Sequence, residues 1–410
     1  MANPKFYPML AGLLFFAIAL QPAHSYGEDP DPSLYQFVSV LVANHPDVKA
    51  SYESLRVAEA SAIAAGRPLY NPELSLEAEN SEEQTRTVGF SQTLDWTRKN
   101  KSQGVIASAE QEIAEAEYKL SRWEATAELL RSLAAFEIGS DLEQLANERA
   151  DLMDDFSEIA KKRLNAGDLT SVEMNLASLA VTEAKMRKAN ALADLSEARQ
   201  GVLGFLPPSP GGWPKLAQAF PAPPSSSVGD SVSELPENIV ARLEVHKADE
   251  EIRLRKKERK PDPTIGLVGG KEGDEDLVAL SFSMPLNIRN NYSAEVAAAL
   301  ARSEQAKQLR DGVRRHTTKR LRSARTRYQI SYDAWKEWED IGLSSLSDQR
   351  SELNKLWESG ELSTTEYLVQ LKQTLDVQES ALELKLELWE SWFEWLRASG
   401  RFENWLRGEI

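Results

Sequence analysis

Four short stretches of alternating polar and apolar residues predict four β-strands, at residues 73–80, 86–96, 264–270 and 277–286. Because successive side chains of a strand point to opposite faces, each strand has one apolar and one polar face. Polar loops join the strands into two hairpins. The apolar faces carry Leu74, Leu76, Phe90, Trp96, Leu280 and Phe282, and the polar faces of the first hairpin carry Glu77, Glu79 and Asp95.

Two very long helices follow the hairpins. Residues 98–165 and 290–358 contain no proline, and in the first of them apolar residues recur at steps of three and four. This spacing is typical of coiled coils, and a helix of this length would span about 100 Å. Gly167 and Gly360 end the two helices, and return helices are expected at residues 168–206 and 362–397. Glu173 and Glu366 stand three residues after Thr170 and Ser363, the spacing of a capping box.

These signals recur in the same order, so the chain consists of two copies of one unit. Asp262-Pro263 follows Asn71-Pro72 by 191 residues, and the Gly360 motif follows the Gly167 motif by 193. The first repeat covers residues 26–206 and the second covers 237–410. A proline-rich linker at residues 207–236 separates them. The predicted fold is mainly α with a small β part, built from tandem helical hairpins and β-hairpins.

Four strands are too few for one chain to form a transmembrane β-barrel alone. Alternating segments of this kind are the weak signature of a transmembrane β-barrel, but four strands cannot close one. Unpaired strand edges are not tolerated in lipid. Either the hairpins belong to a soluble domain, or several chains share one barrel.

The composition of the chain argues against several classes of function. A net charge of −16 argues against a nucleic-acid partner, and the lack of cysteine removes disulfides and thiolate sites. Residues 1–25 have the pattern of an export signal. Lys5 supplies the positive charge, an apolar run extends from Met9 to Leu20, and small residues precede the expected cleavage site. His45, His246 and His316 do not have metal-ligand spacing. We therefore expect no catalytic residues, no metal site, no cofactor and no enzyme activity.

The chain resembles the TolC-like outer-membrane efflux proteins, and in particular their heavy-metal (CzcC-like) branch. The resemblance covers nearly the whole chain after the export signal. It rests on residues 71–74, 89–94, 162–167, 262–264 and 281–287, and on Gly360 with Glu366. It implies a homotrimer with a 12-stranded barrel in the outer membrane and a helical barrel in the periplasm. It also implies a periplasmic membrane-fusion adaptor and an inner-membrane RND pump as partners of a passive exit duct.

Site residues follow from the resemblance and from position. Glu366, and with less support Glu173, would form the periplasmic gate, although both could serve only as capping residues. The adaptor-docking tips would comprise Arg163, Asn165, Gly167, Asp168, Ser359, Gly360, Glu361 and Leu362. Glu77, Glu79 and Asp95 would line the barrel, and Tyr292 would join the apolar strand residues at the lipid surface. The alternatives are a periplasmic structural or adaptor protein, or a channel for drugs or secreted proteins.

Overall fold

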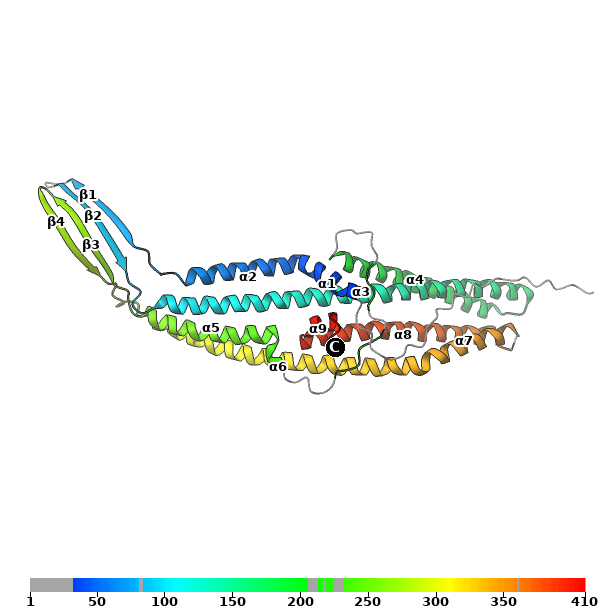
Figure 1. Cartoon of the computed structure of the whole chain (residues 1–410). Helices are drawn as coiled ribbons and strands as arrows, with labels where there is room; N and C mark the ends of the chain where they lie inside the picture. Colours follow the sequence, from blue (N-terminus) through cyan, green and yellow to red (C-terminus); the bar gives the residue numbers. More distant parts are fainter. Residues whose placement is uncertain are drawn as a thin grey trace, which may run out of the picture.

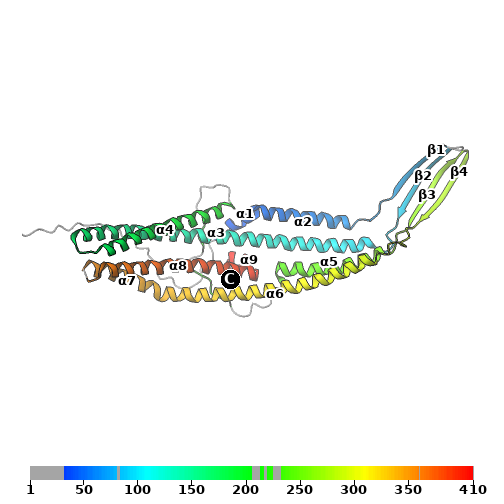
Figure 2. The same cartoon turned by 180° about the vertical axis from the view of Figure 1, so that it is seen from behind.

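The molecule is elongated, with a β-sheet at one end and helical hairpin tips at the other (Figures 1 and 2). The structure is a computed structural model that describes residues 32–80, 84–205, 213–216, 219–224, 232–359 and 361–409. The expected export signal at 1–25 lies outside this range, as does Gly360. The fold is mainly helical with a small sheet, which confirms the predicted class.

The two repeats follow each other along the chain with the same order of elements. After the short helix α1 (Pro32–Asn44), the first repeat runs through α2 (Pro46–Ala65), β1 (Glu73–Asn80), β2 (Gln84–Thr93), α3 (Lys99–Ala166) and α4 (Ser171–Leu203). The second runs through α5 (Pro236–Glu258), β3 (Thr264–Glu272), β4 (Glu275–Ser283), α6 (Ser293–Glu337), η2 (Trp338–Gly342), α7 (Leu343–Glu358) and α8 (Thr364–Ser399). The last helix, α9 (Phe402–Leu406), folds back onto α8.

The prediction of one uninterrupted long helix at residues 290–358 is wrong. The helix begins at Ser293 and contains the π-helical turn η2 between α6 and α7. The offset between the repeats is 192 at β2 and β4 and 193 at the tips, so the second copy is longer by one residue between these points. A π turn is wider than an α turn and takes up additional residues without ending the helix. By contrast, α3 is an unbroken helix of 68 residues, about 100 Å long.

All four strands form one antiparallel sheet in the order β1-β2-β3-β4. The two hairpins therefore join through β2 and β3, with Phe90 opposite Leu267 and Thr93 opposite Thr264. The second strand ends at Thr93 rather than at residue 96. This leaves β1 and β4 as the two edges of the sheet.

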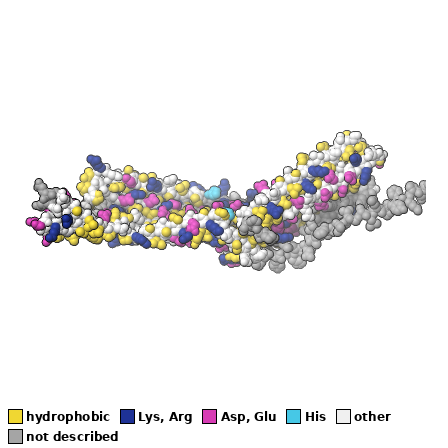
Figure 3. Space-filling model, turned by 90° about the horizontal axis from the view of Figure 1, so that it is seen from above, with side chains coloured by type: hydrophobic (Ala, Val, Ile, Leu, Met, Phe, Trp, Pro, Cys, Tyr) yellow, Lys and Arg dark blue, Asp and Glu magenta, His cyan; other side chains and the backbone are white. Residues whose placement is uncertain are grey.

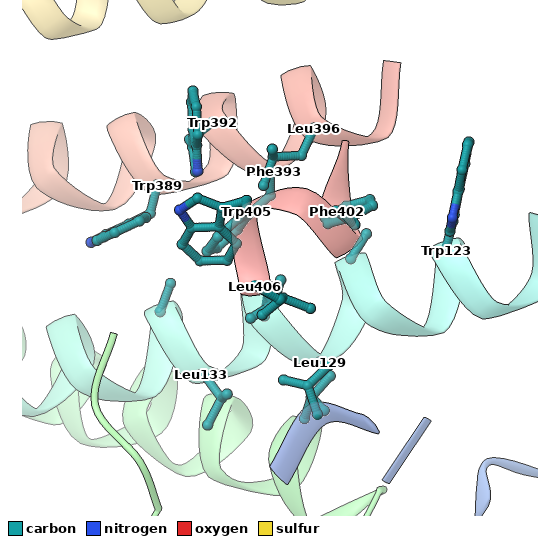
Figure 4. Close-up of a cluster of buried hydrophobic side chains, with 14 of the residues drawn as sticks. Trp123, Leu129, Leu133, Trp389, Trp392, Phe393, Leu396, Phe402, Trp405 and Leu406 are labelled. Carbon is teal, nitrogen blue, oxygen red and sulfur yellow. The ribbon is translucent and has the colours of Figure 1, made fainter. Parts of the chain in front are cut away.

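The main hydrophobic core lies in the middle of the molecule, where α3, α6, α8 and α9 meet. Figure 4 shows Trp405 and Leu406 of α9 between α8 and α3, with Leu129 and Leu133 labelled on α3. Trp392, Phe393, Trp395 and Trp405 are almost fully buried. These aromatic residues near the C-terminus are thus core residues.

Ion pairs also join the two repeats along the contact between α3 and α8. The buried guanidinium of Arg149 on α3 lies 2.9 Å from Asp376 and 3.0 Å from Glu379 on α8. Arg131 and Glu394 form a second pair, 2.8 Å apart. These pairs hold the hairpin of the second repeat against the first along much of its length.

Candidate functional site

One face of the sheet is a continuous apolar surface. The register places Leu74 beside Phe90, Phe90 beside Leu267, and Leu267 beside Leu280, so one row of apolar side chains crosses all four strands. These side chains are strongly exposed, from 55% for Phe90 to 78% for Leu280. Figure 3 shows hydrophobic side chains gathered toward the sheet end, with charged side chains at its extremity. An exposed apolar surface of this kind marks an interaction site, because soluble proteins rarely leave one uncovered.

The opposite face of the sheet is polar. Glu77 and Glu79 lie on it, among serine, threonine and glycine residues of the neighbouring strands. Near the hairpin ends, Glu79 shares a row with Thr85, Glu272 and Glu275, so three carboxylates cross the sheet together. Glu77 and Glu79 therefore lie on the face that was expected to line a barrel.

The expectation that Asp95 lies on this polar face is wrong. Asp95 follows the end of β2, and its two carboxylate oxygens each accept a hydrogen bond of 2.8 Å, from the backbone N–H groups of Lys99 and Asn100. The first N–H groups of a helix have no partner within it, and a nearby carboxylate satisfies them. Asp95 thus caps α3 instead of lying on a face of the sheet.

Two of the proposed lipid-facing aromatic residues also lie outside the strands. The indole of Trp96 donates to the carbonyl oxygen of Pro261 at 2.8 Å. Tyr292 precedes α6 with a φ of 55°. Both residues lie where the sheet meets the helices, so they border the apolar face of the sheet rather than belonging to it.

A buried polar cluster holds the same junction together, and the sequence did not predict it. The ammonium group of Lys99 lies 2.8 Å from Oδ2 of Asp262, and both side chains are buried. Lys99 also donates to the carbonyl of Lys260, and the hydroxyl of Tyr70 donates to the same Oδ2 at 2.8 Å. Burial, together with the neighbouring Asp262 carboxylate, raises the pKa of Tyr70 to about 12. The cluster ties the start of α3 to the segments that enter β1 and β3.

The first helical tip is built as its sequence predicted. Gly167 adopts a φ of 84°, and Asp168 N–H donates to the carbonyl of Arg163 at 2.9 Å. Thr170 begins α4 through a capping box: its N–H donates to Glu173 Oε2 at 2.8 Å, and Glu173 N–H donates back to its hydroxyl. Asn165 and Asp168 are exposed beside this turn.

The second tip uses the same device. Ser363 N–H donates to Glu366 Oε2 at 3.0 Å, and Glu366 N–H donates to the Ser363 hydroxyl at 3.2 Å. Hydrogen bonds to the Glu366 carboxylate from the Ser363 side chain, and then from the Ser363 backbone, lower the pKa of Glu366 below its ordinary value. Glu366 itself is exposed, so its charge faces outward while it caps α8. Ser359 and Glu361 are exposed, whereas Leu362 packs against the core of the tip.

Contacts across the two tips hold them together. Arg163 of the first tip donates to the Thr364 hydroxyl at 3.1 Å and lies over the ring of Trp357. Trp357 stacks on Tyr367 with ring centroids 4.3 Å apart. Of the residues proposed for docking, Arg163 and Leu362 thus also have structural roles within the chain. The remaining exposed tip residues form the end of the molecule.

Solved structures share this fold at low sequence identity. The outer membrane protein VceC from Vibrio cholerae matches with a TM-score of 0.75 at 16% identity, over 90% of this chain and 96% of that one. The MtrE outer membrane channel of Neisseria gonorrhoeae, in its open state, matches with a TM-score of 0.75 at 13% identity, over 98% of each chain. The likeness therefore extends over the sheet, the long helices and both tips.

Sequence comparison gives a match in the first repeat. Residues 37–205 match the family model described as outer membrane efflux protein. The cobalt-zinc-cadmium resistance protein CzcC of Cupriavidus metallidurans is 23% identical over 285 residues, which cover 66% of this chain. The same alignment spans 66% of CzcC, just under two thirds of its length.

None of the described helices combines the length and hydrophobicity that a membrane-spanning helix needs. Among the described residues, no group of three or more histidine, aspartate and glutamate side chains could hold a metal ion. The described residues present three surfaces: an apolar sheet face, a polar sheet face and two capped tips.

Proposed function

We propose that this protein is the outer-membrane exit duct of a tripartite RND-type efflux system, and that it acts as a homotrimer. The observation that carries the proposal is the exposed apolar face that crosses all four strands. Three such sheets would make a 12-stranded barrel, with this face toward lipid and with Glu77 and Glu79 toward the lumen. Closure of the barrel would also pair the two sheet edges, which a membrane requires.

The helices would extend this duct through the periplasm. Their length of about 100 Å carries the tips far from the sheet. The exposed residues Asn165, Gly167, Asp168, Ser359 and Glu361 would meet a periplasmic adaptor that carries the inner-membrane pump. Arg163 and Leu362 would support this surface by holding the two tips together.

We infer that Glu366 also forms the periplasmic gate. In a trimer it would contribute three carboxylates around one axis, and such rings favour cations. The lowered pKa of Glu366 keeps each carboxylate ionised at neutral pH. Capping and gating are compatible, because the hydrogen bonds of the cap leave the side chain exposed.

The first experiment measures membrane location and conductance. The protein should fractionate with outer membranes, run as a trimer in mild detergent, and form cation-preferring channels in planar bilayers. Recovery as a soluble periplasmic monomer would refute the duct and favour a structural protein.

Glu366→Gln tests the gate separately. Glutamine can keep the capping hydrogen bonds but carries no charge, so it removes only the ring of charge. The preference of the channel for cations should fall in Glu366→Gln and persist in the matched variant Glu173→Gln. An unchanged preference in Glu366→Gln would leave Glu366 with its capping role alone.

Divalent metal cations are the proposed cargo, since the CzcC relative is named for cobalt, zinc and cadmium resistance. A strain without this chain should lose tolerance to these ions and regain it when the wild-type gene returns. Unchanged metal tolerance combined with new sensitivity to organic drugs would instead identify a drug channel.

A further inference from the structure

The two edges of the sheet are related by the internal repeat. The strand β1 corresponds to β3 at an offset of 191 residues, as Asn71-Pro72 corresponds to Asp262-Pro263. The strand β2 corresponds to β4 at an offset of 192, as Gly89-Phe90-Ser91 corresponds to Ser281-Phe282-Ser283. In the part of the chain that the structure describes, β1 and β4 each have a strand on one side only.

The observed pairing confirms that the two hairpins are equivalent. Applied to the pair Leu74 and Phe90, the offsets give Ile265 and Phe282, which are paired in the structure. The pair Leu76 and Val88 likewise becomes Leu267 and Leu280, which are also paired. The correspondence therefore holds residue by residue, including the strand register.

The contact between β2 and β3 can then be transferred to the free edges. The outer edge of β4 is equivalent to the edge of β2 that pairs with β3. The outer edge of β1 is equivalent to the edge of β3 that pairs with β2. Each chain thus carries two edges that are complementary through a contact it already makes internally. A second copy of the same chain is the partner that fits both, and repetition of this contact around an axis closes a ring.

We propose that β4 of one copy pairs antiparallel with β1 of a second copy, in the register that places Phe282 opposite Leu76. This is the transferred form of the observed pair of Phe90 and Leu267. The proposal deepens the proposed trimer, on which it rests, by specifying which residues of neighbouring copies meet.

The proposed register places apolar residues beside apolar residues on one face and polar residues beside polar residues on the other. On the apolar face, Leu280 meets Ala78 and Met284 meets Leu74, so apolar side chains adjoin apolar ones. On the polar face, Ser281 meets Glu77. A slip of one residue would move one whole strand to the wrong face. A slip of two residues would keep the faces, so only the repeat distinguishes that register from the proposed one.

The backbone continues the same correspondence beyond the strands. Within the chain, Leu94 N–H donates to the carbonyl of Pro263 at 2.9 Å, just past the ends of β2 and β3. The repeat transfers this hydrogen bond to Leu286 N–H of one copy and the Pro72 carbonyl of the next. The pairing between copies therefore extends toward the helices, as it does inside each chain.

Cysteine cross-linking tests this register directly, because the chain contains no cysteine. The double variant Leu76→Cys/Phe282→Cys is oxidised with copper phenanthroline in native outer membranes and run without reductant. Within one chain the two positions lie three strand spacings apart, roughly 14 Å, so a disulfide between them must join two copies. We expect a ladder of covalent dimer and trimer.

Two matched variants complete the design. Leu74→Cys/Phe282→Cys probes the two-residue slip; in the proposed register these positions are diagonal neighbours about 7–8 Å apart, and its ladder should be lost. Phe90→Cys/Leu267→Cys joins observed neighbours within one chain and should oxidise without changing the oligomer band. This last variant shows that the sheet is folded and accessible to the oxidant.

The outcomes separate the register from the function. If the slipped pair forms the ladder and Leu76→Cys/Phe282→Cys does not, the proposed register is wrong and the trimer stands. The same holds if the protein is trimeric, the in-chain pair oxidises, and neither inter-copy pair forms a ladder. A protein that is monomeric in mild detergent and forms no ladder overturns the register together with the proposed duct.

Discussion

Replacement of Leu280 by arginine distinguishes a membrane sheet from a soluble one. Leu280 lies within β4, on the apolar face, and is 78% exposed. An arginine there costs about 2–4 kcal/mol at the middle of a bilayer. In a trimer with independent sites this becomes roughly 6–12 kcal/mol, comparable to the whole stability of a typical domain. In water, the same replacement would remove an exposed apolar side chain at almost no cost, within about 0.5 kcal/mol.

The neighbouring residue Ala279 provides the matched control. It is also exposed on β4 but points to the polar face, so Ala279→Arg should assemble normally. The assay compares the amount of each variant that reaches the outer membrane as a trimer, and then the urea midpoint of the purified trimers in lipid vesicles. Leu280→Arg should be depleted and destabilised. Equal assembly and equal midpoints for both variants would refute the assignment of this face to lipid.

Three further predictions concern the junction and the tips. Lys99→Met leaves the buried carboxylate of Asp262 without its cation and should lower the free energy of unfolding in denaturant by about 3–5 kcal/mol. Most of this stability should return when Asp262→Leu is added. A decrease below about 1 kcal/mol would indicate that the pair is solvated. Gly167→Ala should destabilise the protein by about 1–2 kcal/mol, because the φ of Gly167 is 84°. Gly312→Ala lies inside α6 with open space around it and should stabilise the protein by up to about 1 kcal/mol. Thermal unfolding would contradict this reasoning if both changes had the same sign. The pKa of Glu366 is lowered in the folded protein, so its carboxylate stabilises the start of α8 above the ordinary value of 4.5, and this stability is lost as pH falls through the lower folded-state pKa. Hydrogen exchange at the start of α8 should therefore accelerate in that acidic range. Glu366→Gln should abolish the acceleration.

Local signals in the sequence predicted much of the fold. Alternation located the strands, and the spacing of Thr170 to Glu173 and of Ser363 to Glu366 located both capping boxes. Each of these features depends on residues close together in the chain, so a periodic pattern or a short motif is enough to specify it.

Features that depend on distant residues could not be read in the same way. The alternating pattern predicted that Asp95 lies on the polar face of a strand. Its carboxylate instead accepts hydrogen bonds from the backbone N–H groups of Lys99 and Asn100 at the start of α3. The pairing of Lys99 with Asp262 joins residues from different repeats. Neither residue type nor spacing distinguishes it from other charge pairs on helices.

The sequence by itself determined the duplication, the strands, the long helices and their capped tips, because these depend on local hydrogen bonds and on the direction in which side chains point. Only the tertiary structure decided the strand order, the register of Phe90 with Leu267, and the buried cluster at the junction. Those depend on which surfaces meet, and many pairings of four similar strands satisfy the same alternating pattern. The observed pairing leaves β1 and β4 at the edges of the sheet, where we propose that a second copy joins.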